Sequence, residues 1–189
     1  GKTKLLDICC RLCDHIDRRF GDEEGKVPGI PGHEEIELAL MRLYRVTGED
    51  RYRKLASYFI DKRGQDPDFC RIVVSKSRGH RQQVTNSYIN RQLITYAQNH
   101  APVREQDTAE GHAVRCMYLY PGAADIAAAN QDETLMEACR KVWDNMTKRR
   151  MYITGGIGAT HQGESFSTDY DLPNDSAYAE TCAAVGVCF

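Results

Sequence analysis

Residues 111–126 read GHAVRCMYLYPGAADI, and residues 32–43, GHEEIELALMRL, begin in the same way. Each stretch opens with a Gly-His pair and continues as a run rich in apolar side chains, which predicts a largely buried helix. A more polar, amphipathic helical pattern follows each one, over residues 51–62 and 133–146. Buried helices that alternate with surface helices predict an all-α toroid of helical hairpins, in which inner helices line a central cavity.

The remaining helical patterns fit this scheme. A helix is expected over residues 5–20, ended by Gly21, and a weaker pattern predicts another over residues 84–99. Pro121 falls within the apolar run 111–126, where a missing backbone donor should kink or end the helix at a cost of about 3 kcal/mol. Asn130 and Glu133 are candidates to cap the helix that follows.

Composition excludes several classes of protein. The chain has 189 residues, is 41% hydrophobic and 28% charged, and carries a net charge of −2. This gives no basic excess for nucleic acid, and no apolar run reaches the roughly 18 residues of a membrane span. The chain starts without methionine and stops within an apolar pattern, so we expect a piece of a longer protein.

The eight cysteines do not resemble a disulfide framework, because most fall at core-like positions of helical patterns. Cys9 and Cys13 lie four residues apart and could bind a metal from one helix face. Without a nearby histidine or second cysteine pair, core packing is the preferred interpretation. A reducing compartment, the cytoplasm, is expected.

The stretch from 155 to 182, GGIGATHQGESFSTDYDLPNDSAYAETC, holds two glutamates and a cysteine: Glu164, Glu180 and Cys182. Its glycines and the Leu-Pro-Asn-Asp turn at 172–175 predict an irregular loop, and such long loops are often functional. Asn174 or Asp175 could cap a helix running through Cys182. Two positions apart on a regular helix, Glu180 and Cys182 would face different directions, so they could share an ion only near a helix end or with ligands from elsewhere. The alternative is a solvated glutamate and a small core cysteine.

His33 and His112 occupy equivalent positions, each at the expected start of an inner helix and hence at the mouth of the cavity. A single histidine at a helix start is usually a capping or packing residue. Two in the same structural position raise the case for a functional role.

Several segments in one order resemble glycoside hydrolase family 127, the β-L-arabinofuranosidases, over nearly the whole chain. They are PGHEEIELAL at 31–40, LY at 43–44, PVREQ at 102–106, GHAVR at 111–115, YITGGIG at 152–158, GESF at 163–166 and YAETC at 178–182. The resemblance implies part of an (α/α)6 barrel. The chain would be one fragment of the catalytic domain, with the last part of the barrel and the β-sandwich domains absent.

The resemblance also implies residue roles. In the family a zinc ion is held by one glutamate and three cysteines, and one of these cysteines is the nucleophile of a retaining mechanism. Carried over by motif, Glu164 is the general acid/base, Glu180 and Cys182 are zinc ligands, and His33 and His112 face the sugar. The nucleophile and the last ligand come from a later Cys-Cys segment that this sequence lacks. The Cys9-Cys10 pair precedes every matching motif and cannot replace it.

This residue set suits glycoside cleavage, in which an acid protonates the departing oxygen while a nucleophile traps the sugar carbon. Zinc would keep a thiol deprotonated, and partial burial would keep Glu164 protonated until it is needed. The expected substrate is an arabinofuranosyl oligosaccharide, with no nucleic-acid or membrane partner and with a homo-oligomer left open. The chain alone is expected to be inactive. Two alternatives remain: a non-catalytic helical scaffold or sugar-binding module, and an α/α-barrel glycosidase of other linkage specificity.

Overall fold

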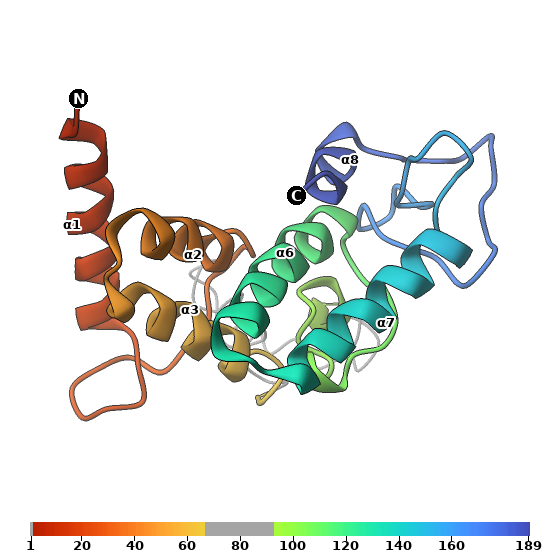
Figure 1. Ribbon diagram of the computed structural model, residues 1–189. Coiled ribbons are helices and arrows are strands. Elements are labelled where there is room, and N and C mark those ends of the chain that lie inside the picture. Colours follow the sequence, from red (N-terminus) through yellow and green to blue (C-terminus); the bar gives the residue numbers. More distant parts are fainter. Residues whose placement is uncertain (1, 67–92) are drawn as a thin grey trace, which may run out of the picture.

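The computed structural model describes residues 2–66 and 93–189, and within these ranges the regular elements are helices (Figure 1). The helices whose bounds lie within these ranges are α1 (Lys4–Arg19), α2 (Ile36–Thr47), α3 (Asp50–Lys62), the short 3-10 helix η1 (Val103–Glu105), α6 (Ala113–Asn130), α7 (Glu133–Arg149) and α8 (Thr181–Val187). The described residues form isolated β-bridges but no named strand. The predicted all-α class is therefore confirmed. The division into domains stays a prediction.

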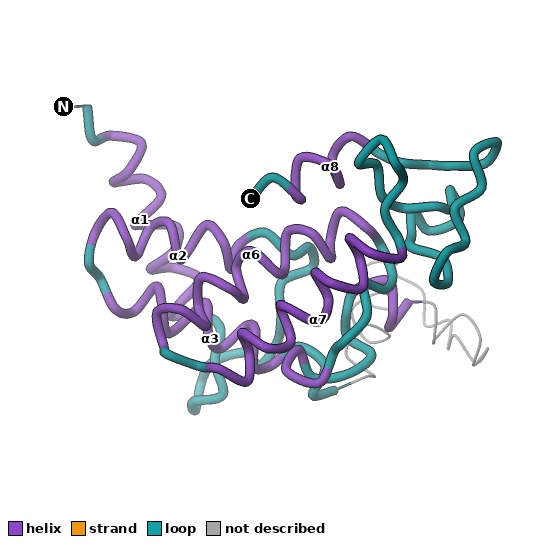
Figure 2. Tube along the Cα trace, turned by 45° about the vertical axis from the view of Figure 1, so that its right-hand side comes forward, coloured by secondary structure: helices purple, strands orange, loops and turns teal. Residues whose placement is uncertain are grey.

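Helix α6 lies at the centre of the packing. It contacts α2, α3, α7 and α8, and Figure 2 shows it running between α7 and the α2–α3 pair. Its buried side chains lie on more than one face, as the apolar run 111–126 predicted; they are Ala113, Val114, Cys116, Met117, Leu119, Tyr120, Ala123, Ile126 and Ala127. Helices α2 and α6 approach closely at Gly122, where a Cβ atom would lie 2.9 Å from the backbone nitrogen of Leu38. Because no side chain separates the two backbones at this glycine, the contact fixes the close spacing of the two inner helices.

The helices pair into hairpins, as expected for a segment of an α/α barrel. Gly48, in a left-handed conformation with φ +75°, ends α2 one residue before the cap of α3. Gln131, with φ +55°, likewise ends α6, and Asp132 begins the turn into α7. In each pair the second helix buries only one side, which matches the predicted alternation of buried and surface helices.

The expectation that Pro121 ends the helix is wrong, whereas a kink at this residue stays a prediction. Pro121 lies inside α6, which continues to Asn130. Proline removes a single backbone hydrogen bond, and the apolar side chains that α6 buries on both sides of Pro121 outweigh that loss.

Two helix starts also differ from expectation. The cap of α7 is Asp132, whose carboxylate accepts the backbone N–H of Leu135 at 3.0 Å, and not Asn130 with Glu133. Helix α8 starts at Thr181 rather than near Asn174, so most of the stretch 155–180 is irregular.

Helix α1, Lys4–Arg19, lies within one residue of the predicted range 5–20 at each end, but it buries no residue completely. Cys9 is exposed and Cys13 is half-buried, so the core position expected for Cys9 is wrong. The seven cysteines in the described ranges are all free, consistent with the expected absence of a disulfide framework in this part of the chain. The helix expected over residues 84–99 falls largely outside the described residues; residues 93–96 are helical.

Within residues 2–66 and 93–189, no helix combines the length and apolar character that a membrane crossing requires.

Candidate active site

His112 caps the N-terminus of α6. Its Nδ1 atom accepts the backbone N–H of Arg115 at 3.2 Å, which satisfies one of the free amide groups of the first turn. An Nδ1 atom that accepts a hydrogen bond carries no proton, so in neutral His112 the proton lies on Nε2. His112 is 5% exposed, and its buried ring presents a fixed N–H donor at the start of the helix.

Glu164 lies at the tip of a tight loop that is bound to this helix start. Thr160 and Ser165 exchange two backbone hydrogen bonds of 3.0–3.1 Å across the loop. The carbonyl of Glu164 then accepts the N–H of Ala113 at 3.0 Å. Gly163 and Glu164 both have positive φ, +74° and +50°, so the predicted irregular loop is observed here. The loop thus brings the carboxylate of Glu164 to the His112 ring.

Both oxygens of the Glu164 carboxylate accept hydrogen bonds. His112 Nε2 lies 2.8 Å from Oε2, and the hydroxyl of Tyr178 donates to Oε1 at 3.0 Å. These two donors, first His112 and then Tyr178, lower the pKa of Glu164. The expectation that burial keeps Glu164 protonated is therefore wrong for this structure, in which its side chain is 43% exposed and ionised.

Glu180 and Cys182 are delivered by a second backbone contact. The N–H of Ala179 donates to the carbonyl of Gly158 at 2.9 Å, which ties the segment before α8 to the loop that leads to Glu164. Glu180 is the cap residue of α8, and its interaction with the Cys182 thiol raises the pKa of that thiol. Both residues therefore lie at the start of α8, and their shared role as metal ligands stays a prediction.

The structure also gathers three ligand atoms that sequence spacing did not link. Single donor atoms of His112, Glu164 and Glu180 all lie within 4.8 Å of one another. Glu180 therefore faces two groups at once: the thiol of Cys182 and the His112–Glu164 pair. Tyr178, which completes the hydrogen bonds of Glu164, was not predicted as a site residue.

His33 reaches the same place from the other inner helix. It lies in the turn before α2, three residues ahead of Ile36, so it precedes the helix and does not cap it. Its ring centroid is 6.3 Å from that of His112, with the rings edge to face. The side chain of His33 is 38% exposed. Both histidines thus lie at or just before the start of an inner helix, as expected, and their rings lie close together. That they face a sugar stays a prediction.

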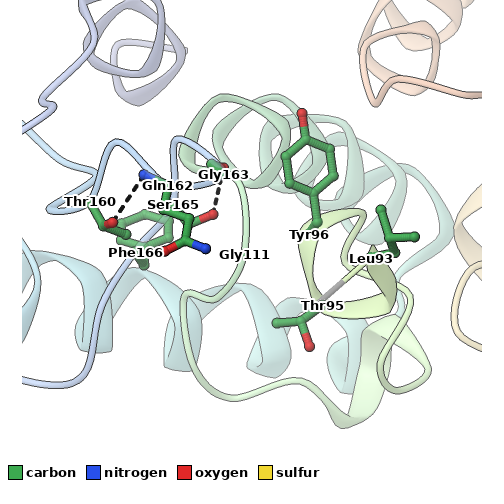
Figure 3. A pocket seen from close by; sticks show the side chains of 9 residues that line it. All are labelled: Leu93, Thr95, Tyr96, Gly111, Thr160, Gln162, Gly163, Ser165 and Phe166. Atoms are coloured by element: carbon green, nitrogen blue, oxygen red, sulfur yellow. Dashed lines mark hydrogen bonds between the residues drawn. The ribbon is translucent and has the colours of Figure 1, made fainter. Parts of the chain in front are cut away.

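A cavity of about 500 Å³ lies beside the loop that carries Glu164, and Figure 3 shows the residues that line it. Its wall includes Gly163 and Ser165, on either side of Glu164, and Tyr96, whose ring centroid lies 4.9 Å from that of His112. The full lining combines hydroxyl, amide and aromatic groups: Leu93, Thr95, Tyr96, Gly111, Thr160, Gln162, Gly163, Ser165 and Phe166. Such a mixture of polar and aromatic groups is typical of small-ligand sites.

The chain matches one protein family over its whole length. Residues 1–189 match the family described as "Beta-L-arabinofuranosidase, GH127 catalytic domain". A curated relative, the "Non-reducing end beta-L-arabinofuranosidase" of Bifidobacterium longum subsp. longum, is 46% identical over 99% of this chain and 28% of its own length. The chain thus spans just over a quarter of that relative.

Two solved structures are similar as well. The GH127 β-L-arabinofuranosidase of Geobacillus stearothermophilus T6 superposes with a TM-score of 0.89 at 50% identity, over 98% of this chain and 28% of that one. A second GH127 β-arabinofuranosidase gives 0.82 at 41% identity, over 98% and 26%.

Proposed function

Because this chain belongs to the GH127 β-L-arabinofuranosidase catalytic-domain family, we propose that the protein carrying it is a retaining glycosidase. It would release β-L-arabinofuranose from arabinofuranosyl oligosaccharides. The observation that carries this proposal is the position of Glu164, hydrogen-bonded to His112 and Tyr178 and close to Glu180.

Glu164 is the proposed acid/base. Cleavage of a glycosidic bond needs a proton on the departing oxygen, and the following hydrolysis needs a base to take a proton from water. The ionised Glu164 described above is the form required for the second task. A sugar seated over this exposed carboxylate would exclude water and so favour the protonated form required for the first.

Glu180 and Cys182 are proposed zinc ligands. One carboxylate oxygen and one thiol, side by side at a helix start, suit the oxygen and sulfur ligands that zinc accepts. When bound, zinc would keep coordinated thiols deprotonated and fix their direction. The family resemblance implies that the other two ligands, including the nucleophilic cysteine, come from a Cys-Cys segment. The present sequence has no such pair after Cys182.

His33 and His112 are proposed to face the sugar. His33 has the more exposed side chain and is free to contact a hydroxyl group. His112 is also the residue that orients Glu164, because its Nε2–H is directed at Oε2. The neighbouring cavity, with its hydroxyl groups and aromatic rings, would take part of the bound oligosaccharide.

The proposal is tested by assaying the protein that carries this chain on a β-L-arabinofuranoside in the presence of methanol. A retaining enzyme transfers the sugar to methanol and gives the methyl β-L-arabinofuranoside, which proton NMR distinguishes from the α product. The matching α-L-arabinofuranoside is the control substrate, and Glu164→Gln is the control variant. Release of the α product, or cleavage of the α-linked control alone, would contradict the proposal.

A further inference from the structure

Glu34 is the residue directly after His33. Its side chain is completely buried. The carboxylate accepts hydrogen bonds from Nη1 of Arg63 at 2.6 Å and from Nη1 of Arg115 at 3.0 Å. A buried carboxylate is costly unless it is paired, so these two arginines fix where Glu34 can lie.

Arg115 connects this carboxylate to both histidines. Its guanidinium also donates to the carbonyl of Gly32, the residue before His33. Its backbone N–H donates to Nδ1 of His112 at 3.2 Å. One residue thus holds the turn that carries His33 and sets the tautomer of His112.

The same guanidinium supports His112 from a second side. It lies over the ring of Tyr96 at 4.9 Å from the centroid, and that ring in turn packs edge to face against His112. A guanidinium held by Glu34 therefore keeps Tyr96 against the histidine.

This cluster contains two acidic and two basic side chains. Arg63 also pairs with the buried Glu37 at 3.5 Å, so two carboxylates face two guanidinium groups. Replacing buried ion pairs by apolar groups is often neutral or stabilising, so stability alone does not account for such a cluster. What the cluster does provide is a fixed position for the groups that it contacts.

We propose that Glu34 is a positioning residue that holds His33 and His112 at their observed separation by way of Arg115. That the two rings act on a sugar rests on the function proposed above. The part of the proposal that concerns the separation of the two rings does not depend on that function.

Three variants test this role. Glu34→Gln keeps the shape but turns an N–H donor toward one of the two arginines, so one contact must open. Arg115 is the less buried partner and should be the one released. Arg115→Lys keeps the charge, but its single ammonium group lacks the planar fork that reaches both Glu34 and Gly32. Glu37→Gln is the control, because it removes a carboxylate from the same cluster at a position paired with Arg63 and not with Arg115. Burial raises the pKa of Glu37, so replacing it by the neutral glutamine is a smaller change than the same replacement at an ionised carboxylate.

The first readout is the nuclear Overhauser effect between the rings of His33 and His112 in this chain. It should be present in the unmodified chain and in Glu37→Gln, and weakened in Glu34→Gln and Arg115→Lys. The second readout is kcat/KM on a β-L-arabinofuranoside, measured in the protein that carries this chain. It should fall about 10- to 100-fold in the same two variants because small misplacements are costly. Glu37→Gln should stay close to the unmodified protein.

An unchanged ring contact in both folded variants would overturn the proposal. If Glu34→Gln does not fold, Arg115→Lys decides, and if neither folds while Glu37→Gln does, the pair is structural and the proposal is wrong. An unmodified protein without arabinofuranosidase activity would refute the function proposed above, whereas the ring contact would still decide the role of Glu34.

Discussion

Gly158 joins the two segments that carry the site, and its replacement by alanine should be more harmful than the same change at Gly155. Both glycines have a left-handed backbone, with φ of +85° and +84°. A Cβ at Gly155 would meet nothing within 4 Å, whereas one at Gly158 would lie 3.2 Å from the Cβ of Ala113. The carbonyl of Gly158 also accepts the N–H of Ala179. Two residues earlier, the carbonyl of Gly156 accepts the N–H of Tyr152.

The magnitudes follow from these two differences. An L-residue in the left-handed region costs about 1–2 kcal/mol, which both variants lose. Gly158→Ala must in addition displace the first turn of α6 or the loop by a few tenths of an ångström, and tight packing of this kind costs about 1 kcal/mol or more. For a chain of this size 1 kcal/mol corresponds to about 2–4 °C in Tm. Gly158→Ala should therefore melt several degrees below Gly155→Ala.

Thermal and urea unfolding of the two variants measure the difference, and the hydrogen bonds at the site supply a second check. A displaced loop should weaken the contact between His112 and Glu164 in Gly158→Ala alone, seen as a change in the His112 ring signals by NMR. Equal stability of the two variants, with unchanged His112 signals in both, would refute the argument that the loop is fitted against α6.

Three further predictions concern stability and metal binding. Hydrogen bonds from Arg150, Arg149 and Asn145 lower the pKa of Asp169 to about 2, below the roughly 3.9 of an unfolded chain. The stabilising effect of the ionised carboxylate should be complete above about pH 4 and lost as the pH falls toward 2. Urea unfolding of Asp169→Asn should therefore differ from that of the unmodified chain near pH 7 and converge with it in acid. A constant difference across this range would count against the prediction. Gly122→Ala should gain about 1 kcal/mol of helix propensity but lose about 1–3 kcal/mol by pressing on the backbone of Leu38, and a stabilised variant in urea unfolding would contradict the close approach of α2 and α6. Zinc should bind this chain weakly in a chelator competition, because Glu180 and Cys182 are two of four implied ligands, and Glu180→Gln should weaken it further; tight, stoichiometric zinc would mean that no further cysteines are needed.

The helical framework was predictable because its signals are local. The apolar runs after Gly32-His33 and Gly111-His112 identified α2 and α6, and the same pattern placed both histidines near the inner helix starts. Pro121 shows the limit of a local rule, since the burial of α6 on several sides overrides the break that proline favours.

The site was less predictable because its geometry depends on backbone contacts between distant segments. Asn174 and Asp175 are good caps by residue type, yet the chain stays irregular to Glu180, held by the hydrogen bond of Ala179 to Gly158 and by that of the Tyr152 hydroxyl to the carbonyl of Pro173 at 3.0 Å. Residue type and spacing do not encode either contact.

Tyr178 was missed for the same reason. A helix through residues 177–185 would point Tyr178 away from Glu180, two residues later. Once the segment is irregular that argument no longer holds, and Tyr178 reaches Glu164. The lowered pKa of Glu164 follows from this contact and from that of His112, neither of which a sequence pattern reveals.

Kinetics of two variants, in the protein that carries this chain, distinguish the roles proposed for Glu164 and Glu180. Glu164→Gln should slow a natural arabinoside by about 10²–10⁴-fold, but much less a substrate whose activated leaving group needs no proton, and it should keep its zinc. Glu180→Gln should lose zinc and slow both substrates alike. If Glu164→Gln loses zinc while Glu180→Gln keeps it and recovers on the activated substrate, the two roles are reversed and the account is wrong.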